Sequence, residues 1–122
     1  MKLDILIKNG LVADLDSGSY INQNIGIVGN RIVDLHTADS QAETVIDAAG
    51  CIVLPGLIDF HAHVFHGGTA ISVNPDVLCL PNGVTSVVDA GSSGWVNYKL
   101  FRNSVLHTAQ TRIKSYLNVV NV

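Results

Sequence analysis

One stretch, residues 52–68, constrains the fold of this chain more than any other: an apolar run interrupted by Pro55-Gly56 and followed by His61 and His63. A short apolar run bounded by turn residues is typical of a strand buried in a sheet. Residues i and i+2 of a strand point to the same face, so both imidazoles are expected to project together from its end. Imidazole is a common ligand of divalent metals, and the pair therefore predicts a metal site. The alternative is two histidines held by backbone groups at a strand end.

The composition points to a chain that buries much of its length. The 122 residues are 48% hydrophobic and only 14% charged, whereas about a quarter of the residues of a soluble domain are usually charged. The net charge of −3 offers no basic surface for nucleic acid. Cys51 and Cys79 lie far apart in apolar surroundings, so we expect two reduced cysteines in the core.

The N-terminal segment carries Asp4 and Lys8 inside its apolar run, so a signal-peptide core is not expected there. No window of the sequence approaches the roughly 18–20 consecutive apolar residues that a membrane-spanning helix requires. We therefore expect a cytoplasmic protein with no membrane partner and no nucleic-acid partner.

Residues 1–52 are expected to form an all-β subdomain with a structural role, made of short strands joined by tight turns. Asn9-Gly10 and Gly29-Asn30 are each flanked by apolar segments, which is a strong signal for a two-residue hairpin. The expected strands span residues 3–8, 11–15, 23–28, 31–35, 44–47 and 51–54. His36 follows one of these strands and is expected to be a solvated loop histidine.

After Gly56 the pattern changes to alternating strands and helices, which indicates right-handed crossovers and a parallel sheet. Asn74 can cap a helix that begins at Pro75. Apolar residues that recur near the 3.6-residue period, beginning with Trp95, Tyr98 and Phe101, predict a second helix with those side chains in the core. The expected strands are 57–64, 84–89 and 112–120, and the expected helices are 75–80 and 95–108. Nothing covers the third strand, so we expect the chain to be the N-terminal part of a larger protein.

Residues 55–63, Pro-Gly-Leu-Ile-Asp-Phe-His-Ala-His, resemble the signature of the amidohydrolase superfamily of metal-dependent hydrolases. In that superfamily a small β-domain precedes a (β/α)8 barrel, and the His-x-His pair closes the first barrel strand. Similarity to the hairpins of that β-domain is found at residues 9–10, 29–32 and 46–50, and similarity to the second barrel strand at residues 83–91. The resemblance implies an α/β fold with a sandwich-like β-subdomain over residues 1–52 and the first three β/α units of a TIM barrel over residues 53–122.

Residues 63–69, together with 89–92 and 113–119, are most similar to the dihydroorotase-like deacetylase branch. That similarity implies hydrolysis of a non-peptide C–N bond in a small molecule, such as a cyclic amide or a purine amidine, or removal of an N-acetyl or acetyl-ester group. Members typically hold one or two divalent metals, usually zinc, which lower the pKa of a bound water. Of the family's metal ligands only His61 and His63 lie in this chain, so no catalytic residue is assigned and the chain alone is expected to be inactive.

The resemblance also draws attention to other polar residues, each with an alternative. Asp59, two residues before the first histidine, is expected on the same face and either orients an imidazole or binds backbone donors. His66 lies on the loop where the family's substrate pocket is found, and it either contacts the substrate or is an exposed loop histidine. Asp89 ends the second strand and is assigned an orienting or loop-anchoring role. Ser92 and Ser93 are expected to be helix caps.

A role outside catalysis remains the alternative for the chain as a whole. An uncovered apolar strand is a template for pairing with another chain, so a structural or self-associating fragment that forms a homo-oligomer is the competing hypothesis.

Overall fold

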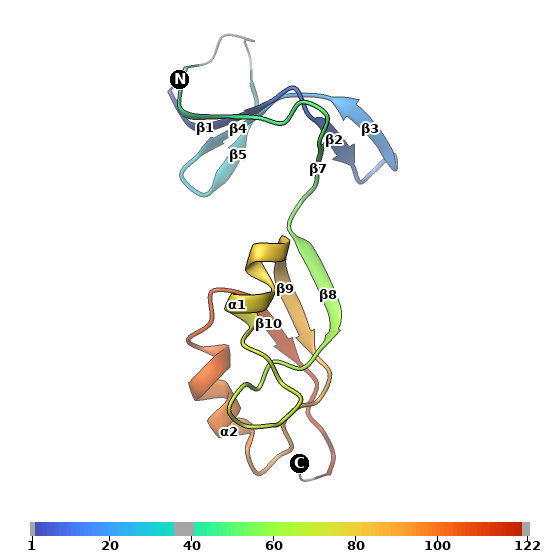
Figure 1. The fold of residues 1–122 in the computed structure, drawn as a ribbon, viewed down its shortest axis with the longest axis vertical. Coiled ribbons are helices and arrows are strands. Elements are labelled where there is room, and N and C mark those ends of the chain that lie inside the picture. The colour runs from blue at the N-terminus through green and yellow to red at the C-terminus, as the bar shows by residue number, and fades with distance from the viewer. Residues whose placement is uncertain (1, 36–40, 121–122) are drawn as a thin grey trace. The chain divides into compact units, whose positions relative to one another are not determined.

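The computed structural model describes residues 2–35 and 41–120, and His36 lies outside them. The chain divides into two compact units, Met1–Pro55 and Gly56–Val122 (Figure 1). The sequence prediction placed this division between residues 52 and 53. No helix of the described residues is long and apolar enough to cross a membrane.

The described part of the first unit forms two small sheets. The larger sheet has the order β5-β4-β1-β6, in which β1 runs antiparallel to β4 and parallel to β6. Its strands are β1 (Leu3–Lys8), β4 (Ile25–Val28), β5 (Arg31–Val33) and β6 (Ala42–Asp47). The smaller sheet has the order β3-β2-β7, with strands β2 (Leu11–Asp14), β3 (Ser19–Asn22) and β7 (Ile52–Val53). Leu3 and Leu6 of β1 are buried in this unit.

The two expected hairpins have different outcomes. The hairpin at Gly29-Asn30 is confirmed, because Val28 pairs with Arg31 across that turn. The prediction of a hairpin at Asn9-Gly10 is wrong, because β1 and β2 belong to different sheets and the chain passes from one sheet to the other at this point. Asn9 adopts a φ of 64° there, and its side chain donates to Asp47 at 2.9 Å. The strand β3 was not predicted, since turn-forming residues dominate its N-terminal side.

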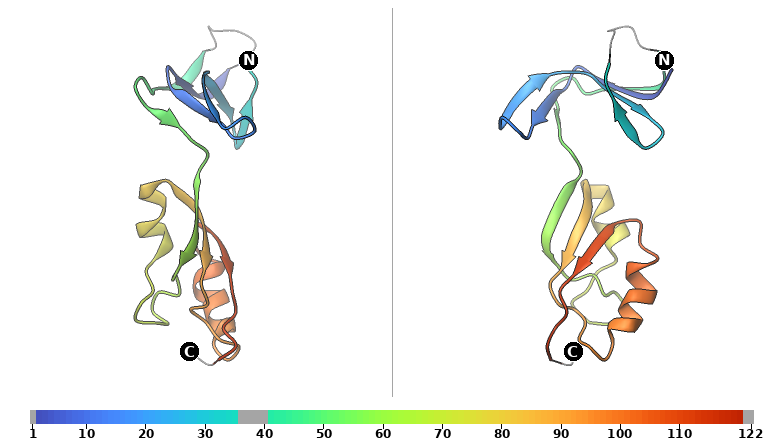
Figure 2. Two further views of the ribbon diagram at one scale, coloured as in Figure 1. Left: turned by 90° about the vertical axis from the view of Figure 1, so that its right-hand side faces the viewer. Right: turned by 180° about the vertical axis from the view of Figure 1, so that it is seen from behind.

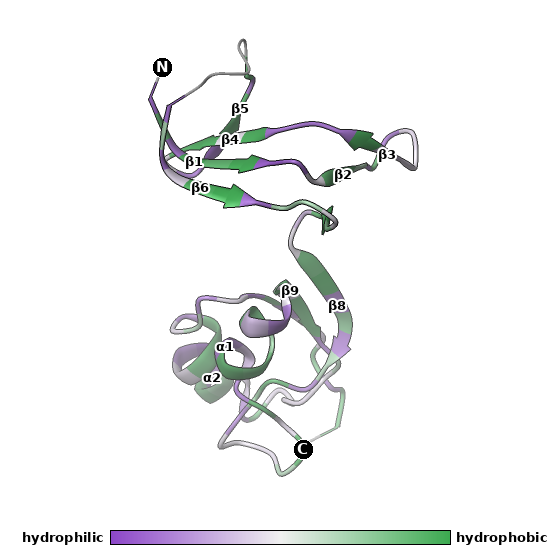
Figure 3. Cartoon of the chain, turned by 45° about the horizontal axis from the view of Figure 1, so that its top comes forward, coloured by the Kyte–Doolittle hydropathy of each residue, from purple (hydrophilic) through white to green (hydrophobic). Residues whose placement is uncertain are grey.

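The second unit is built on a parallel sheet of order β10-β9-β8. The strands are β8 (Leu57–Ala62), β9 (Val84–Asp89) and β10 (Arg112–Ser115), and the helices are α1 (Pro75–Leu78) and α2 (Tyr98–Phe101). A 3-10 turn, Leu80–Asn82, follows α1, and a π-helical segment, Arg102–Leu106, extends α2 (Figure 2). β8 and β9 are apolar along most of their length, and β8 becomes hydrophilic at its end (Figure 3). The result is a strand-helix-strand-helix-strand unit, as the sequence predicts.

Local signals define the first helix correctly. The side chain of Asn74 accepts a hydrogen bond from the backbone N–H of Asp76 at 3.0 Å, which caps α1, and Pro75 occupies the first turn. Gly83 ends the following 3-10 turn at a φ of 76°, a conformation that glycine adopts without strain.

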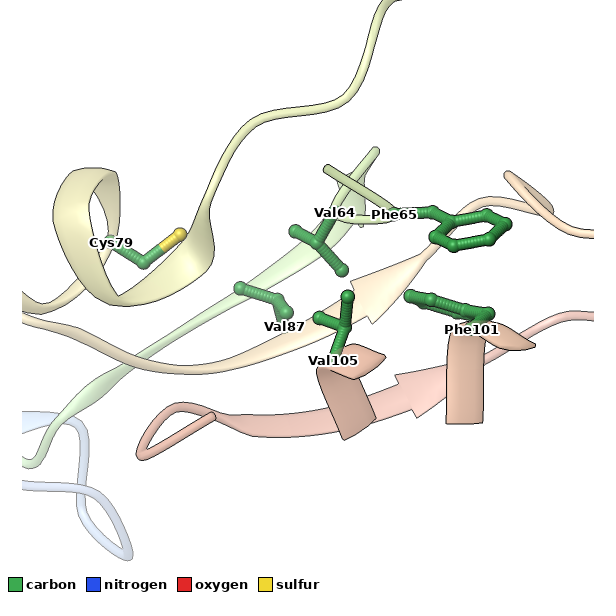
Figure 4. Packing of buried hydrophobic residues seen from close by; sticks show 6 residues of the cluster. All are labelled: Val64, Phe65, Cys79, Val87, Phe101 and Val105. Atoms are coloured by element: carbon green, nitrogen blue, oxygen red, sulfur yellow. The ribbon is translucent and has the colours of Figure 1, made fainter. Parts of the chain in front are cut away.

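The core of the second unit lies between the sheet and the two helical segments. Its buried members are Val64, Phe65, Cys79, Val87, Phe101 and Val105 (Figure 4). The ring centroids of Phe65 and Phe101 lie 4.7 Å apart. Burying an aliphatic or phenyl side chain contributes roughly 1.5–3 kcal/mol, so this cluster holds the helices against one face of the sheet.

Three burial expectations need correction. β8 is not a buried strand, because within the described chain it is an edge strand and all but its last residue are exposed. Trp95 is 69% exposed and precedes the helix, whereas Phe101 is buried and Tyr98 packs against the core. Both cysteines are free, but only Cys79 is buried and Cys51 is exposed. The predicted third strand is also shorter than expected, since β10 ends at Ser115.

Candidate metal and substrate site

The two histidines of the signature stretch come together at the carboxyl end of the parallel sheet. His61 lies near the end of β8 and His63 directly follows the strand. Their ring centroids are 5.8 Å apart and the rings meet edge to face at 77°. This spacing allows two imidazoles to share one cation, and parallel α/β folds place their active sites at this edge of the sheet.

A β-bulge near the end of β8 decides which side chains share a face. Asp59 pairs with Val87 and Ala62 pairs with Asp89, so three steps along β8 match two along β9. Val87 and Asp89 share the face of the sheet that packs against the helices. By this register Asp59 and Ala62 lie opposite residues of that face.

Asp59 contacts the backbone near the end of β8. Its carboxylate accepts a hydrogen bond from the backbone N–H of His61 at 2.9 Å. Of the two alternatives considered for this residue, the contact in the structure is to a backbone donor. The register irregularity between Asp59 and Ala62 interrupts the regular alternation on which the expectation of a shared face was based.

His63 is held by a serine that the sequence analysis assigned to a helix cap. Its Nδ1 lies 2.9 Å from the hydroxyl oxygen of Ser92, in the loop that follows β9. Histidines that bind metals generally use their second ring nitrogen for such an orienting contact. Ser92 does not cap α2, which begins several residues later at Tyr98. The position of Ser92 in the sequence could have indicated this contact, because residues that follow adjacent parallel strands meet at one edge of the sheet.

Asp89 anchors the loops on which these residues lie. Its side chain is fully buried, and its two oxygens accept hydrogen bonds from three backbone N–H groups. These come from Val64 at 2.9 Å, Gly91 at 3.1 Å and Ser92 at 2.7 Å. The contacts agree with the loop-anchoring alternative, because the carboxylate joins the loop after β8 to the loop after β9.

His66 lies in the loop that follows β8. It is partly buried, and its Nδ1 is buried without a hydrogen-bond partner. It lies close enough to Asp76 for its charge to help lower the pKa of that carboxyl. Burial alone acts to raise the pKa of Asp76, but hydrogen bonds from Gln110 and Thr111 outweigh it.

The environment of Cys79 does not favour a role as a metal ligand or nucleophile. Burial raises the pKa of its thiol, and the nearby Asp59 and Asp76 add to that effect. Because the thiolate is the reactive and metal-binding form, this environment favours the inert thiol.

A cavity of about 360 Å³ opens beside His63. Its lining consists of His63, Thr69, Ala70, Ile71, Ala90, Gly91, Ser92 and Asn118. The volume suits a small molecule, and a mostly apolar wall with a few polar groups is typical of ligand sites. His66 and Asp59 are not part of this lining.

The donor set is incomplete within the described residues. No group of three or more histidine, cysteine or acidic side chains is assembled there to hold a metal ion. A catalytic zinc usually has three protein ligands, and the pair His61 and His63 offers two imidazoles.

Comparison with known proteins places the chain in a family. No family model matches it. It is 42% identical over 85 residues, 70% of its length, to a deacetylase of Agrobacterium fabrum. It is 41% identical over 92 residues, 71% of its length, to an adenine deaminase of Rhizobium meliloti. A dihydroorotase of known structure superposes on 96% of the chain with a TM-score of 0.81 and 33% identity.

The chain belongs to the amidohydrolase superfamily. Another amidohydrolase of known structure, an N-acyl-D-glutamate deacylase of Bordetella bronchiseptica complexed with zinc and a phosphonate inhibitor, is 29% identical over 75% of the chain with a TM-score of 0.61. The chain spans 20% of the length of the deacetylase, 15% of that of the deaminase and 31% of that of the dihydroorotase.

Proposed function

We propose that this chain is part of a metal-dependent hydrolase in which His61 and His63 bind a divalent cation, zinc in our assignment. The observation that carries the proposal is the imidazole pair at the end of β8, with one ring oriented by Ser92 beside a cavity of small-molecule size. Bound there, a divalent cation supplies a Lewis acid that lowers the pKa of water. The chain's own part is to hold the cation and to orient its ligands.

The substrate assigned to this site is a small molecule with a non-peptide C–N bond or an acetyl ester. Support comes from the named relatives, which include a deacetylase and an adenine deaminase, and from the dihydroorotase structure. The cavity beside His63 offers hydroxyl groups from Thr69 and Ser92 and the amide of Asn118 among apolar surfaces. Such a lining recognises a compact, polar group without requiring a charge.

A metal-binding experiment tests whether His61 and His63 bind a divalent cation. Zinc affinity of the 122-residue chain is measured by competition with a chromophoric chelator, beside a variant with both His61→Ala and His63→Ala. We expect weak binding by the wild type and none by the double variant. His107→Ala is the matched control, because this exposed histidine ends the helical segment and its side chain accepts a hydrogen bond from Arg102 at 3.1 Å. Equal affinity in wild type and double variant would show that the pair is not the site.

A chimeric enzyme tests whether the site takes part in hydrolysis of the proposed substrates. The aligned segment of the Agrobacterium fabrum deacetylase is replaced by the corresponding residues of this chain, and hydrolysis of acetylated substrates is measured. We expect retained hydrolysis that falls at least about 100-fold on His61→Ala, because that change removes a metal ligand. A chimera that folds, binds zinc and has no activity would contradict the assignment.

A second candidate function follows from a different observation. Ile58 and Phe60 of β8 are 59% and 70% exposed, on a strand with one unpaired edge in the described chain. A non-catalytic, self-associating role would cover these side chains in a homo-oligomer. A monodisperse monomer at micromolar concentration would contradict this candidate and leave the first unaffected.

A further inference from the structure

Three hydroxyl groups form a continuous chain that ends on His63. The hydroxyl oxygens of Thr69 and Ser72 lie 2.6 Å apart, and Ser72 donates to Ser92 at 3.4 Å. The oxygen of Ser92 in turn lies 2.9 Å from Nδ1 of His63. Thr69 and Ser92 also line the cavity, so the chain of hydroxyls runs from the cavity wall to the candidate ligand.

Backbone hydrogen bonds hold both Ser92 and His63 in place. The N–H of Ser92 donates to the buried carboxylate of Asp89 at 2.7 Å, and only 4% of Ser92 is exposed. On the other side, the N–H of Val73 donates to the carbonyl of His63 at 3.0 Å. The serine and the imidazole are therefore held by separate backbone contacts, and their mutual orientation does not depend on a flexible loop tip.

We propose that Ser92 is a positioning residue that selects the ring nitrogen with which His63 meets a cation. A hydroxyl oxygen has two lone pairs, so Ser92 accepts from Ser72 and from the Nδ1–H of His63 together. A proton on Nδ1 leaves the lone pair of the neutral imidazole on Nε2, which then faces the cation. The inference rests on the proposed metal site, but it concerns a hydrogen bond that exists without metal.

The opposite direction of the hydrogen bond between Ser92 and His63 would overturn the proposal. A hydroxyl can also donate to Nδ1, which would place the ring proton on Nε2 and block that nitrogen. The two arrangements differ in the tautomer of His63. That difference can be measured in the zinc-free chain by the ¹⁵N chemical shifts of the ring, which distinguish the two tautomers.

The variants are chosen to separate positioning from folding. Ser92→Ala removes the hydroxyl and Ser92→Thr retains it. Ser93→Ala is the matched control, because Ser93 is also buried and its hydroxyl has no hydrogen-bond partner among residues 2–35 and 41–120. Folding of every variant is checked by its methyl NMR spectrum, and Ser72→Ala serves as a milder second variant if Ser92→Ala does not fold.

In the wild type we expect the Nδ1–H tautomer and weak zinc binding through Nε2. Ser92→Ala should lose the tautomer preference and bind zinc roughly 10-fold to 100-fold more weakly, the usual effect of removing such a contact. Ser92→Thr should restore both properties, Ser93→Ala should change neither, and Ser72→Ala should weaken zinc binding by a smaller factor.

An Nε2–H tautomer in the wild type, or an unchanged tautomer in Ser92→Ala, would overturn the proposal. If even the wild type binds no zinc, the proposed function fails at this site. The tautomer of His63 in Ser92→Ala then still decides the role of Ser92, since that measurement requires no metal.

Discussion

Asp89 joins the two loops that carry His63 and Ser92. Its buried carboxylate accepts three backbone N–H groups, one from the first loop and two from the second. Backbone donors in such loops have no partner within a helix or strand, and a buried donor without an acceptor is costly. Asp89 therefore holds Ser92 in the second loop and Val64, the residue after His63, in the first.

We predict that Asp89→Asn lowers the free energy of unfolding by roughly 2–4 kcal/mol, because the amide removes one acceptor oxygen and the charge from a buried site. Urea denaturation at neutral pH measures the change. Asp59→Asn is the control within the same unit, since this exposed carboxylate accepts only one backbone N–H in the structure and should lose less than about 1 kcal/mol. Equal losses in the two variants would show that Asp89 does not anchor the loops.

The candidate site could be predicted only where its geometry is local. The pairing of His61 with His63 depends on two residues of extended chain, and the sequence contains that information. The prediction that Asp59 shares the face of His61 assumes regular alternation, whereas the pairing of β8 with β9 is irregular between Asp59 and Ala62. Ser92 was missed because its contact with His63 requires the two loops to be brought together by Asp89.

At the scale of elements, the same distinction separates correct from incorrect predictions. β1, β9 and the start of α1 match their predicted ends, because alternation, β-branching and an Asn-Pro cap act within a few residues. The Asn9-Gly10 hairpin fails because β1 finds both neighbours farther along the chain, in β4 and β6. The predicted helix over 95–108 shortens to α2 and its π-helical extension, which suffice to bury Phe101 and Val105.

Asp76 joins two elements that are distant in sequence. It lies in α1, and its carboxylate accepts hydrogen bonds from the N–H of Gln110 and from the N–H and hydroxyl of Thr111. These residues directly precede β10, so the side chain ties the first helix to the start of the third strand. Burial acts to raise the pKa of Asp76, but the hydrogen bonds outweigh it and hold the pKa below the usual range for aspartate.

We predict that Asp76 stabilises the fold at neutral pH and that this contribution disappears in acid. Its lowered pKa means that the folded chain binds this proton less tightly than the unfolded chain. The contribution is therefore complete above the ordinary aspartate pKa, near pH 4, and is lost as the pH falls through the lowered value. Asp76→Asn should cost roughly 1–2 kcal/mol at pH 7, measured by urea denaturation, and progressively less as the pH falls below the ordinary aspartate pKa.

Asp16→Asn is the control for this pH dependence, because Asp16 lies in an exposed turn and its side chain should contribute little at either pH. A cost for Asp76→Asn that stays constant between pH 7 and pH 3 would indicate that the charge of the carboxylate is not what holds Thr111.

At the scale of the whole molecule, the described chain leaves much apolar surface exposed. Twenty-three large hydrophobic residues are exposed, and those of β8 lie on a strand with one unpaired edge. Natural sheets usually protect such edges with charges, bulges or covering elements. The segment that aligns with the deacetylase relative spans 20% of that protein's length.

We predict that the isolated chain self-associates through β8. Native mass spectrometry of the wild type at micromolar concentration should show oligomers. Phe60→Lys should shift the population towards monomer by at least about 10-fold, because a lysine charge at an exposed strand position opposes edge-to-edge pairing. Ile32→Lys is the matched control, since Ile32 is 76% exposed but lies in the first unit.

The pattern across the two variants decides between modes of assembly. Loss of oligomers in Phe60→Lys alone assigns the contact to β8, whereas equal loss in both variants would indicate non-specific association of exposed apolar surface. A zinc-dependent oligomer that Phe60→Lys leaves intact would contradict the prediction in another way. It would mean that imidazoles from separate chains share the cation, and that the two ligands of one chain are completed by a second copy.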